Sequence, residues 1–173
     1  MTTPRIRNLR LIVAALILAL FVFSCAKKGE KHVIGGNAPD FSLSDIQGNS
    51  VRLSDFSGKV VLVEFWATWC GPCLDAVPEM NALYEKYRSR GFIVLGISVD
   101  KGKDMQARLA SFAKEHAITY PILHDIGDVN GRYGVYSIPS TFIINREGNI
   151  AGNHVGFSPA LKEILSKEIE ALL

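Results

Sequence analysis

The chain has 173 residues, of which 48% are hydrophobic and 21% are charged. This is enough for one domain with a substantial core and a short additional segment. Three of the 19 basic residues, Arg5, Arg7 and Arg10, lie within residues 1–24, which leaves 16 basic against 17 acidic residues and a net charge of −1. A near-neutral domain lacks the basic surface typical of nucleic-acid-binding proteins, so we expect no nucleic-acid partner.

An unbroken apolar segment, Leu11–Phe23, follows these arginines. A membrane span needs about 17–25 residues, so this segment is short for one and fits the apolar core of a signal peptide. We therefore predict a signal peptide over residues 1–24, a tether over 25–37 and a folded domain over 38–173.

The last residues of the apolar segment, Val22-Phe23-Ser24-Cys25, resemble a bacterial lipobox. The resemblance implies that Cys25 carries a lipid, although Phe23 departs from the usual small or polar residue at its position. The alternative is an uncleaved signal anchor. Both interpretations place the domain outside the cytoplasmic membrane, facing the periplasm and attached to the membrane.

The first predicted elements form a hairpin and a β-α-β unit. Alternating residues at 41–43 and 51–53 lie on either side of Gln47-Gly48-Asn49, which predicts a hairpin. The continuous apolar runs Val60–Trp66 and Phe92–Val99 predict strands buried on both faces, with a helix over Leu74–Arg90 between them. Strands joined in this way should be parallel.

The second half of the chain predicts two helices and three short strands. Residues 104–117 have helical periodicity, and residues 120–123 read as a short strand. Residues 141–145 and 150–155 predict a second hairpin. Ser158 and Pro159 predict the start of the last helix, with Ser158 as N-cap.

The run Trp69-Cys70-Gly71-Pro72-Cys73 lies between the first buried strand and its helix. Both thiols therefore fall in the first helical turn, where Cα atoms about 5–6 Å apart suit a disulfide. The partial positive charge of a helix N-terminus stabilises a thiolate. Cys70 and Cys73 can thus alternate between dithiol and disulfide, which is redox chemistry without a cofactor.

The cysteine count sharpens this prediction. If Cys25 carries lipid, Cys70 and Cys73 are the two remaining cysteines of the chain. In an oxidising compartment such a pair is oxidised unless a partner reduces it. Half of a zinc site is the alternative, but zinc takes four N or S ligands, and the four histidines, at positions 32, 116, 124 and 154, are scattered singly. We expect no metal.

Two motifs resemble the thioredoxin superfamily: the pentapeptide after an apolar strand, and Ile138-Pro139-Ser140-Thr141 before a later strand. The hairpin from Pro39, the run from Phe65 to Cys70, and the extra helix and strand near residues 104–123 resemble its TlpA-like, membrane-tethered branch. That branch includes the thiol reductases of cytochrome c maturation. The resemblance covers residues 38–173. It implies an α/β thioredoxin-like fold, a central mixed sheet flanked by helices, with an N-terminal β-hairpin and an inserted helix and strand.

The resemblance also implies roles for the site residues. Cys70 would be the exposed attacking thiol and Cys73 the resolving thiol. The Ile138–Pro139 peptide would be cis and face both cysteines. The residues expected to contact the substrate are Trp69, Gly71, Pro72, Ile138 and Pro139.

The partners that the resemblance implies are disulfide-bearing substrate proteins, with apocytochrome c as one candidate, and a membrane electron donor. We expect a monomer. One position departs from the pattern: reductases of cytochrome c maturation often carry a Glu three residues after the second cysteine, where this chain has Ala76.

Glu64 lies in the middle of the first buried strand. A buried, unpaired carboxylate is costly, so its pKa should rise. The superfamily often has a buried acid at this position, and we predict that Glu64 is the general base for Cys73. The alternative is a structural residue that reaches solvent or pairs with Lys59.

Two other functions compete with thiol–disulfide exchange. A peroxidase of the peroxiredoxin type shares the fold but needs a Thr three residues before its reactive Cys, whereas Thr68 lies two residues before Cys70. A copper-delivery module can combine a cysteine pair with a distant His, although its cysteines typically have wider spacing.

Overall fold

The computed structural model describes residues 34–173. The predicted signal peptide, Cys25 and most of the predicted tether therefore lie outside the described residues. None of the helices within residues 34–173 combines the length and the hydropathy that a membrane span requires.

A five-stranded mixed sheet forms the centre of the domain, in the order β5-β4-β3-β6-β7. The strands β3, β4 and β5 are parallel, whereas β6 and β7 run antiparallel to their neighbours. The mixed sheet and the parallel β-α-β pairing agree with the sequence predictions. The strands are β3 (Val60–Trp66), β4 (Phe92–Ser98), β5 (Ile122–His124), β6 (Ser140–Ile144) and β7 (Ile150–Val155).

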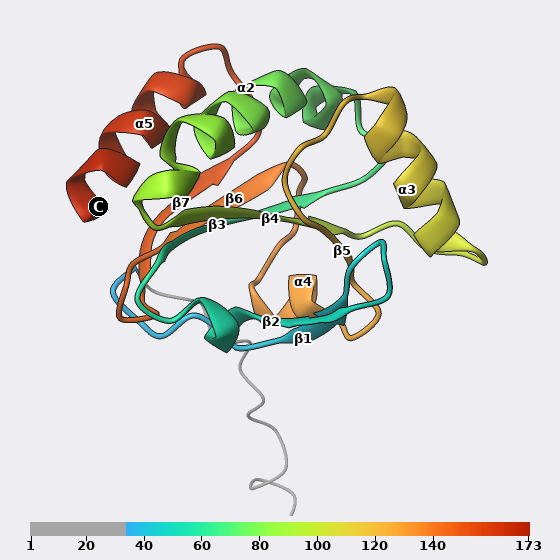
Figure 1. Ribbon diagram of the computed structural model, residues 1–173, viewed down its shortest axis with the longest axis horizontal. Coiled ribbons are helices and arrows are strands. Elements are labelled where there is room, and N and C mark those ends of the chain that lie inside the picture. The colour runs from blue at the N-terminus through green and yellow to red at the C-terminus, as the bar shows by residue number, and fades with distance from the viewer. Residues whose placement is uncertain (1–33) are drawn as a thin grey trace, which may run out of the picture.

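Helices cover one face of the sheet, and the N-terminal hairpin covers the other (Figure 1). The helical face carries α2 (Gly71–Tyr87), α3 (Met105–Glu115) and α5 (Leu161–Leu172). The opposite face carries β1 (Ser42–Ser44), β2 (Ser50–Arg52), the short helix α4 (Val129–Arg132) and the 3-10 turn η1 (Leu53–Phe56). The predicted N-terminal hairpin and the inserted helix and strand are both present.

The alternation of side chains along β3 explains why every residue of this strand is buried. Val61, Val63 and Phe65 pack toward the hairpin, and Val60 and Leu62 pack toward the helices. Burying one such apolar side chain contributes about 1.5–3 kcal/mol. Glu64 lies two residues after Leu62, so its side chain points to the same face of the strand, toward the helices.

Several element boundaries differ from the predictions. The helix α5 begins at Leu161 with Ala160 as N-cap, because Ser158 and Pro159 form a turn in which the Leu161 N–H donates to the Ser158 carbonyl at 2.9 Å. The helix α2 begins at Gly71, and its last predicted residues form a separate 3-10 turn, η2 (Arg88–Arg90). No sequence pattern predicted α4.

The N-terminal end of the described chain lies beside β7. The Gly35 N–H donates to the Ile150 carbonyl at 2.8 Å, and the Ala38 N–H donates to the Gly148 carbonyl at 2.9 Å. Ile150 begins β7 and pairs with Ile144 at the end of β6. The chain therefore enters the domain at the edge where β3 begins and β6 ends.

Candidate active site

The opposite edge of the sheet brings the two predicted motifs together. Phe65, near the end of β3, pairs with Ser140 at the start of β6, because the two strands are antiparallel. The loop to Cys70 leaves β3 at this edge, and Pro139 enters β6 at the same edge. Residues far apart in the sequence thus form one site.

Cys70 and Cys73 form a disulfide at the N-terminus of α2, with Cα atoms 5.2 Å apart and an S–S distance of 2.09 Å. Cys70 is the N-cap residue, and its Sγ accepts a hydrogen bond from the Cys73 N–H at 3.3 Å. The same N–H is placed to stabilise a Cys70 thiolate once the disulfide is reduced.

Both cysteines are buried in the disulfide form. Cys70 is 6% exposed and Cys73 is 2% exposed, because both pack in a cluster with Trp66, Ala67 and partly buried Ile138. The expectation of an exposed Cys70 is therefore wrong for the disulfide form, although Cys70 is the more accessible of the two.

The Ile138–Pro139 peptide bond is cis, as the resemblance implied. The Ile138 side chain packs against the cluster that contains both cysteines. Among residues 34–173, no backbone hydrogen bond involves the N–H or the carbonyl of Ile138. These groups are therefore available to an extended partner segment.

Exposed aromatic and aliphatic side chains occur at the same edge. Trp69, next to Cys70, is 72% exposed, and Tyr136, two residues before Ile138, is 98% exposed. Val155 is exposed and pairs through its backbone with Ser140. The sequence predicted Trp69 at this edge but not Tyr136 or Val155, because no motif distinguishes these two from core residues.

A buried carboxylate holds the loop before Cys70. Asp100 accepts hydrogen bonds from the Thr68 N–H at 2.9 Å, the Thr68 hydroxyl at 2.7 Å and the Ser98 hydroxyl at 2.8 Å. Charge-assisted bonds of this kind are about twice as strong as neutral ones. Both the N–H and the hydroxyl of Thr68 are therefore bonded to Asp100, a contact that no sequence motif predicted.

Glu64 is 2% exposed, and its Oε1 has no hydrogen-bond partner within residues 34–173. Burial raises the pKa of Glu64 from 4.5 to about 8, while a hydrogen bond from the Tyr120 hydroxyl acts in the opposite direction. The structural alternative is wrong, because the carboxyl does not reach solvent and the Lys59 ammonium lies instead 5.6 Å from the Phe56 ring centroid.

The position of Glu64 along β3 relates it to Cys73. Leu62, two residues earlier, packs with Met80 and Leu83 of α2, and Trp66, two residues later, packs with Cys73. Glu64 therefore lies between these two residues on the same face of β3, the face that α2 covers. A carboxyl with a pKa near 8 exchanges its proton readily near neutral pH.

The histidines of the described chain have separate partners. His124 Nε2 lies 3.0 Å from the Asp100 carbonyl, His154 lies 2.9 Å from Glu168, and His116 stacks on Phe112 with ring centroids 4.2 Å apart. Within residues 34–173, no three His, Cys, Asp or Glu side chains form a group that could hold a metal ion.

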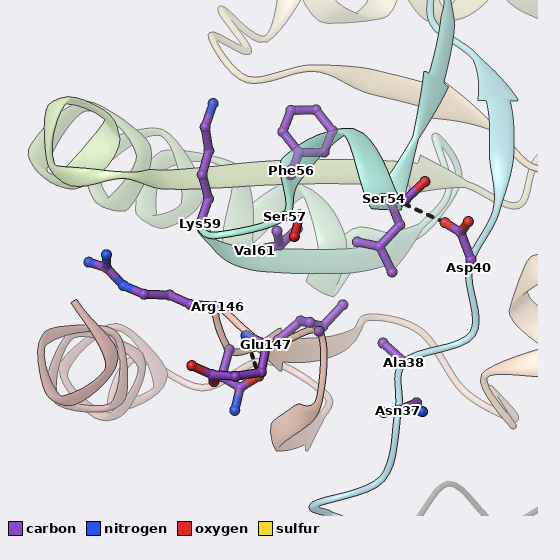
Figure 2. A pocket seen from close by; sticks show the side chains of 14 residues that line it. Asn37, Ala38, Asp40, Ser54, Phe56, Ser57, Lys59, Val61, Arg146 and Glu147 are labelled. Carbon is purple, nitrogen blue, oxygen red and sulfur yellow. Dashed lines mark hydrogen bonds between the residues drawn. The ribbon is translucent and has the colours of Figure 1, made fainter.

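A cavity of about 500 Å³ lies far from the cysteines, at the edge where the chain enters the domain. Figure 2 shows Phe56, Ser57 and Lys59 on one side and Arg146 and Glu147, from the turn between β6 and β7, on the other. Both signs of charge line it. This cavity is separate from the redox site.

The sequence is similar to known thiol–disulfide proteins. A family model described as the AhpC/TSA family matches residues 34–152. The thiol-disulfide oxidoreductase ResA of Geobacillus thermodenitrificans is 37% identical over 140 residues, which cover 80% of this chain and 78% of the relative. The thioredoxin-like protein YneN of Bacillus subtilis is 38% identical over 122 residues, or 70% of this chain and 71% of the relative.

Solved structures show the same likeness in three dimensions. A crystal structure from Chlorobium tepidum, provisionally named thiol:disulfide interchange protein DsbE, has a TM-score of 0.75 and 38% identity, and the match covers 81% of this chain and 97% of that one. A second Chlorobium tepidum structure, a thiol:disulfide interchange protein of the thioredoxin family, has a TM-score of 0.70 and 26% identity, with the same coverage. The predicted thioredoxin-like fold is confirmed.

Proposed function

Because the chain belongs to the AhpC/TSA family and is a thiol–disulfide oxidoreductase of thioredoxin-like fold, we propose that it reduces protein disulfides outside the cytoplasm. The observation that carries the proposal is the Cys70–Cys73 disulfide at the N-terminus of α2, at the sheet edge that also carries the cis Ile138–Pro139 peptide. The reducing direction is supported by Gly71-Pro72, a pair that the thioredoxin resemblance associates with the reducing end of the superfamily.

The proposed reaction has two exchange steps. The Cys70 thiolate attacks one sulfur of the substrate disulfide, forms a mixed disulfide and releases the other substrate sulfur as a thiolate, which takes a proton from water. The Cys73 thiolate then attacks Cys70 Sγ, re-forms the Cys70–Cys73 disulfide and releases the second substrate thiolate, which is also protonated. The substrate gains two electrons and two protons, and a dithiol protein at the membrane resets the enzyme by the reverse exchange.

Glu64 is the proposed proton carrier for Cys73. Its carboxylate takes the Cys73 proton before the resolving attack, and its carboxylic acid returns a proton when a donor reduces the disulfide. With a pKa of about 8, roughly one-tenth of the carboxyl is ionised at pH 7. The remaining site residues are proposed to bind substrate: Trp69, Gly71 and Pro72 beside the attacking sulfur, and Ile138 and Pro139 through strand-like pairing.

The sharpest test of this function is to trap the substrates. In Cys73→Ser, the mixed disulfide on Cys70 has no resolving thiol and accumulates, so mass spectrometry of the trapped complexes from the native host identifies the partners. Cys70→Ser, which lacks the attacking thiol, is the matched control and should trap nothing. Equal recovery of disulfide-linked proteins from both variants would contradict the proposed roles.

The trapped proteins also decide the pathway. Apocytochrome c with CxxCH thiols among them would support a role in cytochrome c maturation, despite Ala76, whereas unrelated secreted proteins would support general disulfide reduction.

Two assays test the competing functions. Rapid consumption of hydrogen peroxide would favour a peroxidase. Tight copper binding that the double variant Cys70→Ser/Cys73→Ser abolishes would favour copper delivery.

We further propose that Cys25 is lipidated after removal of residues 1–24. The support is the apolar run after three arginines and the small residue before Cys25. Cells grown with labelled palmitate should label the wild-type protein, and Cys25→Ala should remain unlabelled. Cys70→Ala is the control and should retain the label. An unlabelled wild-type protein that stays in the membrane fraction would favour the uncleaved signal anchor.

A further inference from the structure

Tyr120 is a buried residue without a role in the reaction described above, and it lies against the carboxyl of Glu64. We propose that Tyr120 is the positioning residue of this carboxyl: its hydroxyl holds the carboxyl beneath Cys73 and keeps its ionised form accessible near neutral pH. This inference rests on the proposed role of Glu64 as proton carrier and extends it to a second residue.

A glycine on the neighbouring strand makes room for the tyrosine ring. Gly96 of β4 is the register partner of Glu64, and its N–H donates to the Pro121 carbonyl at 2.9 Å. A Cβ at position 96 would lie 2.9 Å from Tyr120 Cε2 and 3.1 Å from Trp66 Nε1. Real Cβ atoms essentially never approach another atom closer than 3.0 Å, so a side chain at position 96 would force the Tyr120 ring to shift and would also crowd Trp66.

The surroundings of Glu64 contain few polar groups. On the helical face, α3 contributes the buried apolar residues Met105, Leu109 and Ala113. Thr141 of β6 is the other register partner of Glu64, and beyond it His154 of β7 is paired with Glu168. From α2, the titratable group on this side is Cys73.

Tyr120 is the hydrogen-bonding side chain that acts on the pKa of the Glu64 carboxyl. Trp66 Nε1, which also lies beside Gly96, has no hydrogen-bond partner within residues 34–173. Burial, followed by the charge of Glu64 and the hydrogen bond to it, holds the pKa of Tyr120 well above its usual value. The hydroxyl thus remains a donor at every pH at which the enzyme works. A donated hydrogen bond favours the carboxylate over the acid, so its loss raises the pKa of Glu64 further.

The test separates the two exchange steps in time. The full-length protein, purified in detergent and reduced, is mixed with excess Ellman's reagent, which releases one aryl thiolate when Cys70 attacks and a second when Cys73 resolves. In Tyr120→Phe we expect an unchanged first phase and a second phase about fivefold slower at pH 7, with the midpoint of its pH profile displaced upward. Gly96→Ala, which displaces the ring, should move the midpoint in the same direction.

Tyr87→Phe is the matched control, because it also removes a buried hydroxyl but one that bonds Ser166 and Glu170 at 2.5 Å, at the other end of α2. It should leave both phases unchanged. As a second readout, carbon-13 NMR of the Glu64 carboxyl, assigned with Glu64→Gln, should titrate at higher pH in Tyr120→Phe than in wild type.

Each failure has a distinct signature. An unchanged second phase and Glu64 titration in Tyr120→Phe, with a slow second phase in Glu64→Gln, would overturn the role of Tyr120 alone. An unchanged second phase in Glu64→Gln would overturn the proton-carrier role and this inference with it. Absence of the first phase in the wild type would refute the proposed dithiol reaction itself.

Discussion

At the residue scale, the core of this protein contains a carboxyl group in the middle of strand β3. The apolar residues on both sides of Glu64 predicted its burial, and the structure confirms it. The sequence could not indicate its neighbour, because Tyr120 reaches it from the loop before β5 and only where Gly96 leaves space. Side-chain pairs of this kind depend on how two strands and a loop pack together.

The buried carboxyl should also govern how stability depends on pH. Glu64 in the folded protein keeps its proton up to about pH 8, whereas its ordinary pKa is 4.5. Between these values the unfolded chain binds fewer protons than the folded one, so the free energy of unfolding falls as the pH rises, by up to about 1.4 kcal/mol per pH unit. We expect Glu64→Gln to gain stability relative to wild type from pH 5 to pH 8.

Urea unfolding of the oxidised proteins at several pH values measures this difference. Glu115→Gln, at an exposed position, is the control and should retain the wild-type dependence on pH. If wild type and Glu64→Gln lost stability in parallel over this range, the buried carboxyl would not be protonated in the folded state.

At the scale of elements, the long buried strands were predicted well because their continuous apolar runs have one interpretation in an α/β sheet. Helix ends were predicted less well, since they depend on local hydrogen bonds. The short helix α4 begins where the Asp125 carboxylate accepts from the N–H groups of Val129 and Asn130, at 2.9 and 2.8 Å. A helix of this length has no hydrophobic periodicity from which the sequence could predict it.

The connection from α2 to β4 depends on the backbone conformation of one glycine. Gly91 follows η2 with φ of 87°, and its carbonyl accepts from the Val60 N–H at 2.9 Å. Since no atom lies near its missing Cβ, the cost of Gly91→Ala is one of backbone strain, and we expect a loss of about 1 kcal/mol in the free energy of unfolding.

Gly127→Ala is the matched control for this change, because position 127 is equally open and does not have a left-handed backbone. Its free energy of unfolding should stay within about 0.5 kcal/mol of wild type. Equal losses in the two variants would show that the effect of Gly91→Ala does not come from its φ angle.

At the scale of the whole molecule, the redox site and the cavity occupy opposite edges of one sheet. The topology followed from the family resemblance, but the burial of Cys70 and the cavity did not, because both depend on how loops pack over the sheet. Because the two edges are separate, a change at the cavity should alter stability without altering the redox site.

Arg146 lines the cavity and holds the end of α5. It donates from Nε to the Leu172 carbonyl at 3.2 Å and from Nη2 to the Leu173 carbonyl.

We therefore expect Arg146→Ala to lower the free energy of unfolding by about 1–2 kcal/mol, from the loss of these charge-assisted bonds. Resolution of the mixed disulfide at 25 °C should remain at the wild-type rate. Thr68→Val, which removes the hydroxyl bond to Asp100 beside Cys70, is the comparison and should slow the exchange. A slower exchange in Arg146→Ala would mean that the two edges are coupled.

The hydrogen bonds of Gly35 and Ala38 to the start of β7 and its turn determine how the domain can be mounted on a surface. Immobilised through a residue at Gly35 on a resin or an electrode, the domain would turn the active-site edge, with exposed Trp69, toward the solution and away from the support. Immobilised through Lys101, next to the Asp100 support of the active-site loop, it would turn that side toward the solid. We expect only the first orientation to exchange disulfides with large proteins in solution.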